Sequence, residues 1–380
     1  MSYQRRDLLN WGPASCFYKD DLYTLTFGRT ATDEMEKMFF GEIDRLGHGA
    51  VAEIAEFAGI TKSSGPDAFR NLPAYMGAQR FRTPRGLDDL KKRASWEADS
   101  PNATLIALAC VFQAYATMWA EGVWEIVRAR QSPTKFIVTD DPVTFYCQVM
   151  FPSEWNYPED CNLKQIGTRT LFPLGLDSCL IITHLQLTRH PKATPTEYRE
   201  NARYYDQTMM HLGHIQFGRE LEEDEVLRIN YILKKRSTRY IAAAKKEWLY
   251  PERRVSTTDW KRLDEDWFLL PHLWKIPFSS GIAAGGDGWA WAADEYGRHP
   301  GEPQYQDKRM HEIDWIRHQL AEREWARKRV GKSVAHIDEF WHDSDGLMHK
   351  YLQEEGLMPD QIAAVPSAAK SLAKSGSSMP

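Results

Sequence analysis

One strand–turn–strand pattern, at residues 135–150, constrains the fold of this chain more than any other stretch. Its sequence, KFIVTDDPVTFYCQVM, starts with a run of β-branched and aromatic residues at 136–139, as a buried strand requires. Asp140-Asp141-Pro142 ends this run, because aspartate bonds its own backbone in turns and proline lacks an N–H donor. A second apolar run follows at 143–150. The pattern predicts two strands joined by a turn that carries two adjacent carboxylates.

Amphipathic helices are predicted on both sides of this pattern. Apolar residues recur at three- and four-residue steps, which is the spacing of one buried helix face. The predicted helices are 35–57, 66–81, 87–96, 101–130, 195–210 and 222–246. The region of about 32–131 is therefore expected to form a helical layer.

Two more strands are predicted after the turn, at 168–174 and 179–183, with a turn signal between them. The expected fold class is α+β, mainly helical, with a small mixed β-sheet of about four to five strands. Residues 1–251 are expected to form this α+β core, with the sheet at about 135–184 and the later helices at about 195–246.

The rest of the chain is expected to form an extension of the core. Residues 252–365 are rich in aromatic residues and contain charged helical patterns, so they predict a helical C-terminal extension. Residues 366–380 lack large apolar side chains, which predicts a disordered tail.

Composition bears on the location and the partners of the protein. The net charge of −5 gives no overall attraction to nucleic acid or to an acidic membrane, so a nucleic-acid partner requires a local basic face. Five scattered cysteines without a CxxC pair argue against a disulfide framework and predict a reducing, cytoplasmic location. The N-terminus has no apolar segment typical of a signal peptide, and we expect no membrane partner.

The two carboxylates of the turn are the first candidate site. Asp140 and Asp141 can bind a hard divalent cation such as Mg²⁺, or position a water molecule for catalysis. Glu36 on the first predicted helix is the candidate third catalytic group, with Glu42 and Asp44 as alternatives. The competing interpretation is a structural turn in which Asp140 accepts backbone N–H groups.

A polar cluster at the end of the second predicted helix is the candidate substrate-binding site. It contains Gln79, Arg80 and Arg82. A guanidinium group binds carboxylate or phosphate through two parallel hydrogen bonds, so the cluster can hold a phosphate-bearing ligand beside the Asp140 turn. The competing interpretation is an Arg–Asp pair that joins the helical layer to the sheet.

Histidines and the C-terminal third supply further candidates. His211 and His214 are three residues apart and can bind a metal with His184 as third ligand, or they can be ordinary core and surface histidines. Residues 281–329 combine a Gly- and Trp-rich loop with a basic helix, so they can contact a protein partner or nucleic acid. The competing interpretation is an irregular segment and a solvated helix with i,i+4 ion pairs.

Four short motifs, taken in order, resemble the bacterial and fungal family called domain of unknown function 4238. Members carry a strand that reads roughly "fiTSDnPv", which stands here as FIVTDDPV at 136–143. The other three motifs are QRFRTP at 79–84, LFPLG at 171–175, and Ile229-Asn230 followed by RYIAA at 239–243. The resemblance covers about Cys16 to Pro251 and implies the α+β core, without a settled reaction. The family's usual N-terminal motif, "kHhvPrfyL", is absent before Cys16.

Two classes of function follow from these candidates. The first is a cytosolic, metal-assisted hydrolase that acts on a phosphate-containing or nucleic-acid substrate through the carboxylates of the turn. The second is a non-enzymatic binding protein that uses its aromatic-rich C-terminal third. The enzyme is favoured if one open pocket contains Asp140, Asp141, Glu36 and the Arg82 region. If Asp140 instead accepts only backbone N–H groups, the enzyme hypothesis loses its main catalytic residue.

Overall fold

The computed structural model divides the chain into two compact units. The first contains Met1–His184, Pro195–Tyr198 and Arg203–Pro271, and the second contains the remaining residues. The structure describes residues 8, 25–27, 30–32, 40–59, 66–83, 86, 111, 114–150, 160–189, 193–199, 215–264, 280–284 and 290–294.

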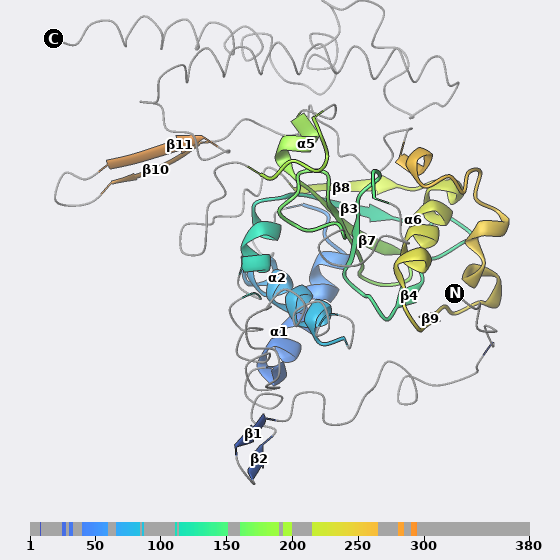
Figure 1. Cartoon of the computed structure of the whole chain (residues 1–380), viewed down its shortest axis with the longest axis horizontal. Helices are drawn as coiled ribbons and strands as arrows, with labels where there is room; N and C mark the ends of the chain where they lie inside the picture. Colours follow the sequence, from blue (N-terminus) through green and yellow to red (C-terminus); the bar gives the residue numbers. More distant parts are fainter. Residues whose placement is uncertain are drawn as a thin grey trace, which may run out of the picture. The chain divides into compact units, whose positions relative to one another are not determined.

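A five-stranded mixed sheet forms the centre of the first unit (Figure 1). Its strands, in spatial order, are β5 (Thr144–Tyr146), β6 (Arg169–Pro173), β7 (Ser178–Thr183), β3 (Val123–Arg128) and β8 (Ile215–Glu220). β3 and β8 run parallel, whereas the other neighbours are antiparallel. The combination of this sheet with helices confirms the predicted α+β class.

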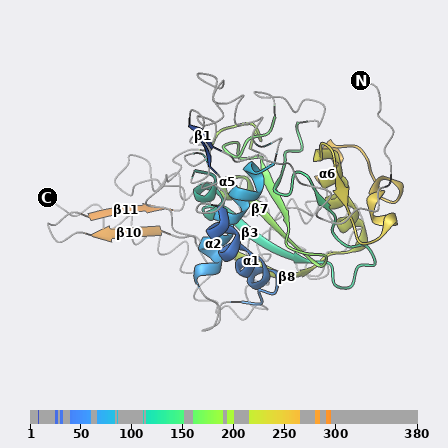
Figure 2. The same ribbon diagram turned by 90° about the horizontal axis from the view of Figure 1, so that it is seen from below.

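Helices cover both faces of the sheet (Figures 1 and 2). α1 (Gly41–Ala55) and α2 (Pro66–Phe81) lie on one face, and α6 (Glu223–Arg236) lies on the other. Because successive side chains of a strand point to opposite faces, β7 sends Leu180 into the first core and Ile181 into the second. The first unit thus has a hydrophobic core on each side of its sheet.

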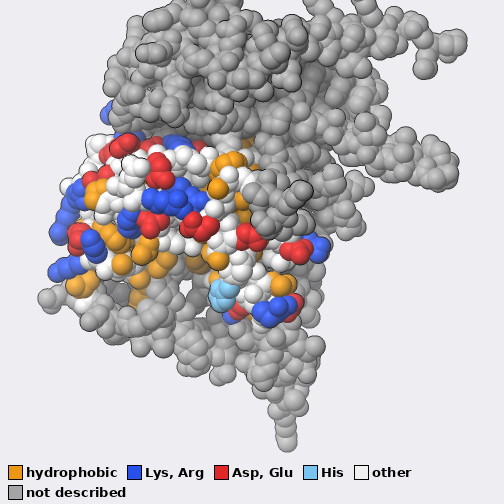
Figure 3. All heavy atoms as spheres, turned by 180° about the vertical axis from the view of Figure 1, so that it is seen from behind, with side chains coloured by type: hydrophobic (Ala, Val, Ile, Leu, Met, Phe, Trp, Pro, Cys, Tyr) orange, Lys and Arg blue, Asp and Glu red, His pale blue; other side chains and the backbone are white. Residues whose placement is uncertain are grey.

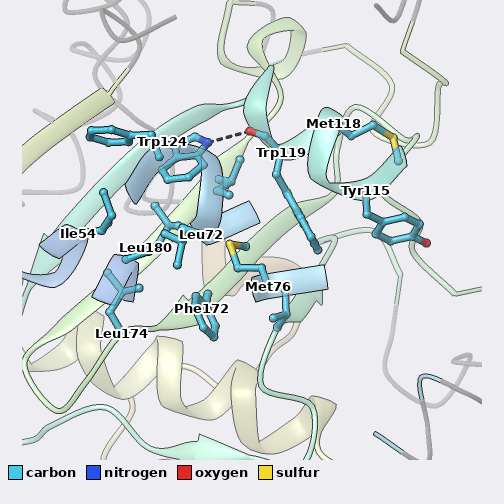
Figure 4. Close-up of a cluster of buried hydrophobic side chains, with 14 of the residues drawn as sticks. Ile54, Leu72, Met76, Tyr115, Met118, Trp119, Trp124, Phe172, Leu174 and Leu180 are labelled. Atoms are coloured by element: carbon cyan, nitrogen blue, oxygen red, sulfur yellow. Dashed lines mark hydrogen bonds between the residues drawn. The ribbon is translucent and has the colours of Figure 1, made fainter. Parts of the chain in front are cut away.

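Two buried tryptophans organise the first core (Figure 4). The indole N–H of Trp124 donates to the carbonyl oxygen of Trp119 at 2.7 Å. The indole of Trp119 donates to the hydroxyl oxygen of Thr170 at 2.9 Å. Leu72 and Met76 of α2 fill the space around these rings. Each indole therefore keeps a hydrogen bond while its ring is removed from water.

The helix predicted over 101–130 is wrong in its second half. Residues 114–120 are helical, but the chain then turns at Gly122 and enters β3. A Cβ atom at Gly122 would lie 2.4 Å from Cγ2 of Ile182, so this turn requires glycine. All six residues of β3 are buried, and a strand buried on both faces shows no alternation that separates it from a buried helix. β3 and β8 make the described part of the first unit less helical than predicted.

The other helices agree with their predictions to different degrees. α2 has the predicted bounds, whereas α1 begins at Gly41 and α6 ends at Arg236. After α6 the chain forms β9 (Ile241–Ala242), which pairs with β4 (Val138–Thr139). Three short 3-10 helices follow among the described residues: η6 (Lys246–Leu249), η7 (Pro251–Arg253) and η8 (Lys261–Asp264). Residues 195–199 form a turn and a single β-bridge, so the predicted helix does not begin there.

Smaller elements complete the description. In the first unit, β1 (Leu25–Phe27) pairs with β2 (Thr30–Thr32). The second unit contains α5 (Leu185–Arg189) and an antiparallel hairpin of β10 (Ser280–Ala284) and β11 (Ala290–Asp294). The hairpin lies in the Gly- and Trp-rich segment for which one interpretation was an irregular loop. The predicted helix at 87–96, the C-terminal helices and the tail lie outside the described residues. No helix in the described part is long and apolar enough to cross a membrane.

Candidate functional site at the Asp140 turn

The Asp140 turn connects strands of two different sheets. β4 before it pairs with β9, and β5 after it belongs to the five-stranded sheet. The hydroxyl groups of Thr139 and Thr144 both donate to the carbonyl oxygen of Asp141, at 3.0 and 2.6 Å. The strand–turn–strand prediction is confirmed, but the two strands do not pair with each other.

Asp140 is occupied by the backbone that leaves α6. Its Oδ1 accepts the N–H of Thr238 at 2.9 Å, and its Oδ2 accepts the N–H of Arg239 at 2.6 Å. The N–H of Asp140 donates in turn to the carbonyl oxygen of Tyr240 at 3.0 Å. Hydrogen bonds to a charged carboxylate are among the stronger ones in proteins, so Asp140 fixes the direction of this segment. The geometry is that of the structural interpretation.

Asp141 forms a buried ion pair with Arg80 of α2. Arg80 also donates to the carbonyl oxygen of Val143 at 3.3 Å, and its guanidinium carbon lies 4.4 Å from the ring centroid of Phe145. Arg80 is 5% exposed and Asp141 is 1% exposed. The pair therefore joins the helical layer to the sheet, which is the competing interpretation of the predicted anion-binding cluster.

A second buried ion pair lies close to the first. Arg236, the last residue of α6, binds Asp160 through contacts of 2.8 and 3.0 Å. Burial opposes the charge of Arg236, but the neighbouring acidic groups Cys161, Asp160 and Asp141 raise its pKa overall. Asp141 thus acts on both arginines, Arg80 and Arg236. The two pairs form one cluster, here called the buried charge cluster: Arg80, Asp141, Asp160 and Arg236.

Arg236 has a signal in the sequence, although it belongs to none of the predicted sites. Arg236 falls on the same helix face as Ile229 and Leu233, both of which are buried. An arginine in the apolar stripe of a helix needs a buried acceptor, because an unpaired buried charge is costly. The sequence around Asp160, which precedes β6, has no pattern that identifies this residue as the acceptor.

Arg82 contacts α1 instead of the turn. Its Nη1 donates to both carboxylate oxygens of Asp44, at 2.7 and 2.6 Å, and its guanidinium carbon lies 4.9 Å from the ring centroid of Phe40. Residues two apart on a helix point in nearly opposite directions, which separates Arg82 from Arg80. Gln79 is half-buried on α2. The side chains of the predicted substrate-binding cluster therefore point to different places: Arg80 contacts the turn, and Arg82 contacts α1.

The metal hypothesis finds no complete ligand set among the described residues, where no group of three or more His, Cys, Asp or Glu can hold a metal ion. Glu36, His211 and His214 lie outside the described residues. His184 is buried, with Nε2 2.8 Å from the carbonyl oxygen of Leu163. Burial lowers the pKa of His184 to about 4, so this histidine is neutral at physiological pH.

Three of the four sequence motifs meet around the turn. Arg80 comes from QRFRTP, Asp140 and Asp141 come from FIVTDDPV, and Asn230 comes from the motif in α6. The side-chain amide of Asn230 donates to the carbonyl oxygen of Lys135 at 2.8 Å and accepts the N–H of Ile137 at 3.2 Å. The motifs thus have a shared physical role: they hold the segment 135–143 between the two helical layers.

Comparison with known proteins supplies no relative from which a role can be transferred. No protein-family model, curated protein or solved structure matches the chain. The family resemblance therefore rests on the four motifs alone.

Proposed function

We propose that the protein acts by binding a partner, and that the Asp140 turn has a structural role, in which it connects the elements packed around it. The observation that carries this proposal is the double use of Asp140, whose two oxygens accept the backbone N–H groups of Thr238 and Arg239. Asp141 is likewise engaged by Arg80. A catalytic carboxylate must present an oxygen to a metal, a water molecule or a substrate. In Asp140 each oxygen instead accepts a backbone N–H, which is the task of a carboxylate that fixes a turn.

The cytosol is the proposed location. The described cysteines Cys147, Cys161 and Cys179 are buried thiols that form no disulfide, which suits a reducing compartment. Burial raises the pKa of Cys161 to about 12, which keeps its thiol protonated at neutral pH.

The Asp140→Asn variant separates binding from metal-assisted hydrolysis. Mg²⁺ and Mn²⁺ are titrated by calorimetry, and phosphomonoester and phosphodiester hydrolysis are measured on the wild type and the variant. A binding role predicts no saturable metal binding that depends on Asp140, and the same background hydrolysis in both proteins. Asp67→Asn, which changes an exposed carboxylate in the first turn of α2, is the matched control.

One result would reject the binding role. That result is a hydrolytic activity that Asp140→Asn loses and Asp67→Asn retains, while the melting temperature of Asp140→Asn stays at the wild-type value. The Asp140 carboxylate would then take part in catalysis. The hydrolase prediction from sequence would then be the better account of the turn.

A further inference from the structure

A basic surface surrounds the C-terminal end of α6 and the 3-10 helices after it. Over residues 235–262, eight Lys and Arg side chains are exposed, against three exposed acidic side chains, in a chain of net charge −5. The basic residues are Lys235, Arg239, Lys245, Lys246, Arg253, Arg254, Lys261 and Arg262. The acidic residues are Glu247, Glu252 and Asp259. The local charge is therefore opposite to that of the whole chain.

Contacts with α6 hold this segment in place. The hydroxyl group of Tyr231 donates to the carbonyl oxygen of Thr258 at 3.2 Å. The ammonium group of Lys234 donates to the carbonyl oxygen of Leu249 at 2.5 Å. Two tryptophans of the segment are buried: Trp248 and Trp260. The basic side chains consequently project from a packed surface whose backbone is fixed by the core.

Most of the acidic side chains within the surface are already engaged. Glu252 pairs with the buried Lys234 at 2.9 Å. Asp259 accepts the backbone N–H of Lys261 at 3.1 Å. Figure 3 shows basic side chains gathered at the left of the described surface, the side that carries α6, with acidic groups between them. Arg254 is paired with Glu223 of α6 at 2.6 Å, so the excess of positive charge rests on the other basic side chains of the surface.

Aromatic rings in the surface are engaged by its own cations. Arg253 and Lys234 lie 4.3 and 4.8 Å from the ring centroid of Tyr250. Two similar contacts of 5.3 Å join Lys245 to Trp248 and Lys235 to Tyr231. Base stacking on a protein requires an available aromatic face. These three rings instead orient cations, and Tyr240 is the one aromatic side chain of residues 235–262 that is exposed, so the surface offers more contacts to phosphate groups than to bases.

We propose that this surface binds the phosphodiester backbone of a nucleic acid without preference for sequence. Arginine forks bind phosphate oxygens bidentately, and lysines add point charges. A polymer fits better than a small anion, because the cations are spread over the end of α6, the turn after it and the 3-10 helices. The inference rests on the proposed binding role and names the chemistry of the partner.

Charge-reversal variants test this surface. Fluorescence anisotropy measures the binding of labelled random-sequence single strands and duplexes to the full chain between about 50 and 200 mM salt. The wild type is expected to show a log Kd that rises linearly with log salt, with a slope of about 4.5 for a duplex if some five phosphates are contacted. Lys246→Glu with Lys261→Glu is expected to weaken binding at least about 10-fold and to lower the slope by about 2.

The control reverses two exposed charges elsewhere in the described part, Arg70→Glu with Lys164→Glu. It carries the same change in net charge, so it should shift the affinity less than about 3-fold. Equal loss in both double variants, or no saturable binding by the wild type, would overturn the proposal. Equal affinity for polyglutamate or for anionic lipid vesicles would also overturn it, in favour of an acidic protein or a membrane.

The Asp140→Asn variant in the same assay keeps the two proposals distinguishable. Suppose that hydrolysis depends on Asp140 while salt-dependent binding persists. The proposed function is then rejected, and the proposal that the basic surface binds nucleic acid is kept. If binding is absent and Asp140 has no chemical effect, the surface assignment fails alone.

Discussion

The buried charge cluster shows how much of the site a sequence can reveal at the level of single residues. An Arg–Asp pair between the helix end and the turn was one of the two interpretations, without Arg80 and Asp141 being singled out, because an arginine at a helix end and an aspartate at a strand end are both visible in the sequence. The Arg236–Asp160 pair was not expected, since the two residues are 76 positions apart and neither lies in a recognisable motif. Local patterns indicate which charges will be buried, but the partner depends on the tertiary fold.

Breaking the Arg80–Asp141 pair from one side should destabilise the protein strongly. Arg80→Met leaves the 1%-exposed Asp141 carboxylate without its ion pair, and loss of one partner of a buried pair costs about 3 to 5 kcal/mol. Urea denaturation measures this change in the free energy of unfolding. The double variant Arg80→Met with Asp141→Leu should recover part of the loss, because it removes both charges together.

The matched control for this pair is Arg45→Met, which breaks the exposed contact between Arg45 and Glu42 on α1. Exposed ion pairs contribute little to stability, so its denaturation curve should overlay that of the wild type. A small effect of Arg80→Met, similar to that of Arg45→Met, would show that the buried pair does not hold α2 to the sheet.

His184 should make the stability of the protein depend on pH. Its pKa in the folded state is lowered to about 4, below the ordinary value of 6.5, so the unfolded chain binds the proton more readily. This contribution to stability is complete above pH 6.5, and it falls by roughly 3 kcal/mol as the pH decreases to 4. Urea midpoints between these pH values should decline less in His184→Gln than in the wild type. Parallel declines would assign the pH dependence to other groups.

Individual elements were predictable where their ends carry local signals. α2 has the predicted bounds, since Pro66 and Asp67 mark its start and Arg82-Thr83-Pro84 marks its end. α6 was predicted to continue to Lys246, but its own last turn already carries Lys234, Lys235 and Arg236. The carboxylate that fixes the chain after α6 belongs to Asp140, which is 98 positions from Thr238. A helix end that depends on such a distant contact has no local signature.

β3 was mistaken for a helix because it is buried on both faces, and its start supplies a test. Gly122→Ala would place a methyl group 2.4 Å from Cγ2 of Ile182, so Ile182 or the turn must move. Overpacking of this kind costs about 1 to 3 kcal/mol, measured by urea denaturation. Gly175→Ala is the control, because a Cβ at that position meets nothing within 4 Å. Equal stability of the two variants would contradict the close packing of this turn.

At the scale of the whole molecule, composition and local charge give different answers about partners. The net charge of −5 argued against nucleic acid, yet eight of the eleven exposed charged residues over 235–262 are basic. Net charge averages over the chain, whereas binding depends on the charges that one surface presents. The sequence placed the basic candidate at 281–329. The cations of 235–262 are separated along the chain by residues that the fold buries, such as Trp248 and Trp260, so their concentration on one surface appears only in the structure.

The division into two units predicts the behaviour of a shortened chain. A chain that ends at Pro271 retains both hydrophobic cores and the buried charge cluster, all of which lie within the first unit. It should unfold cooperatively in urea with a midpoint close to that of the full chain, followed by far-UV circular dichroism. A non-cooperative or absent transition would show that the first unit needs residues beyond Pro271.

The bonds of Asp140 have a mechanical consequence for the basic surface. Arg239 belongs to that surface, and its backbone N–H is held by Asp140. A force applied to Arg239 by a bound polymer would pass into the Asp140 turn, and from there through Arg80 into α2 and through β5 into the central sheet. Tension at the surface would be shared by buried elements of the first unit. The turn would act as an anchor point, which resists displacement without touching the ligand.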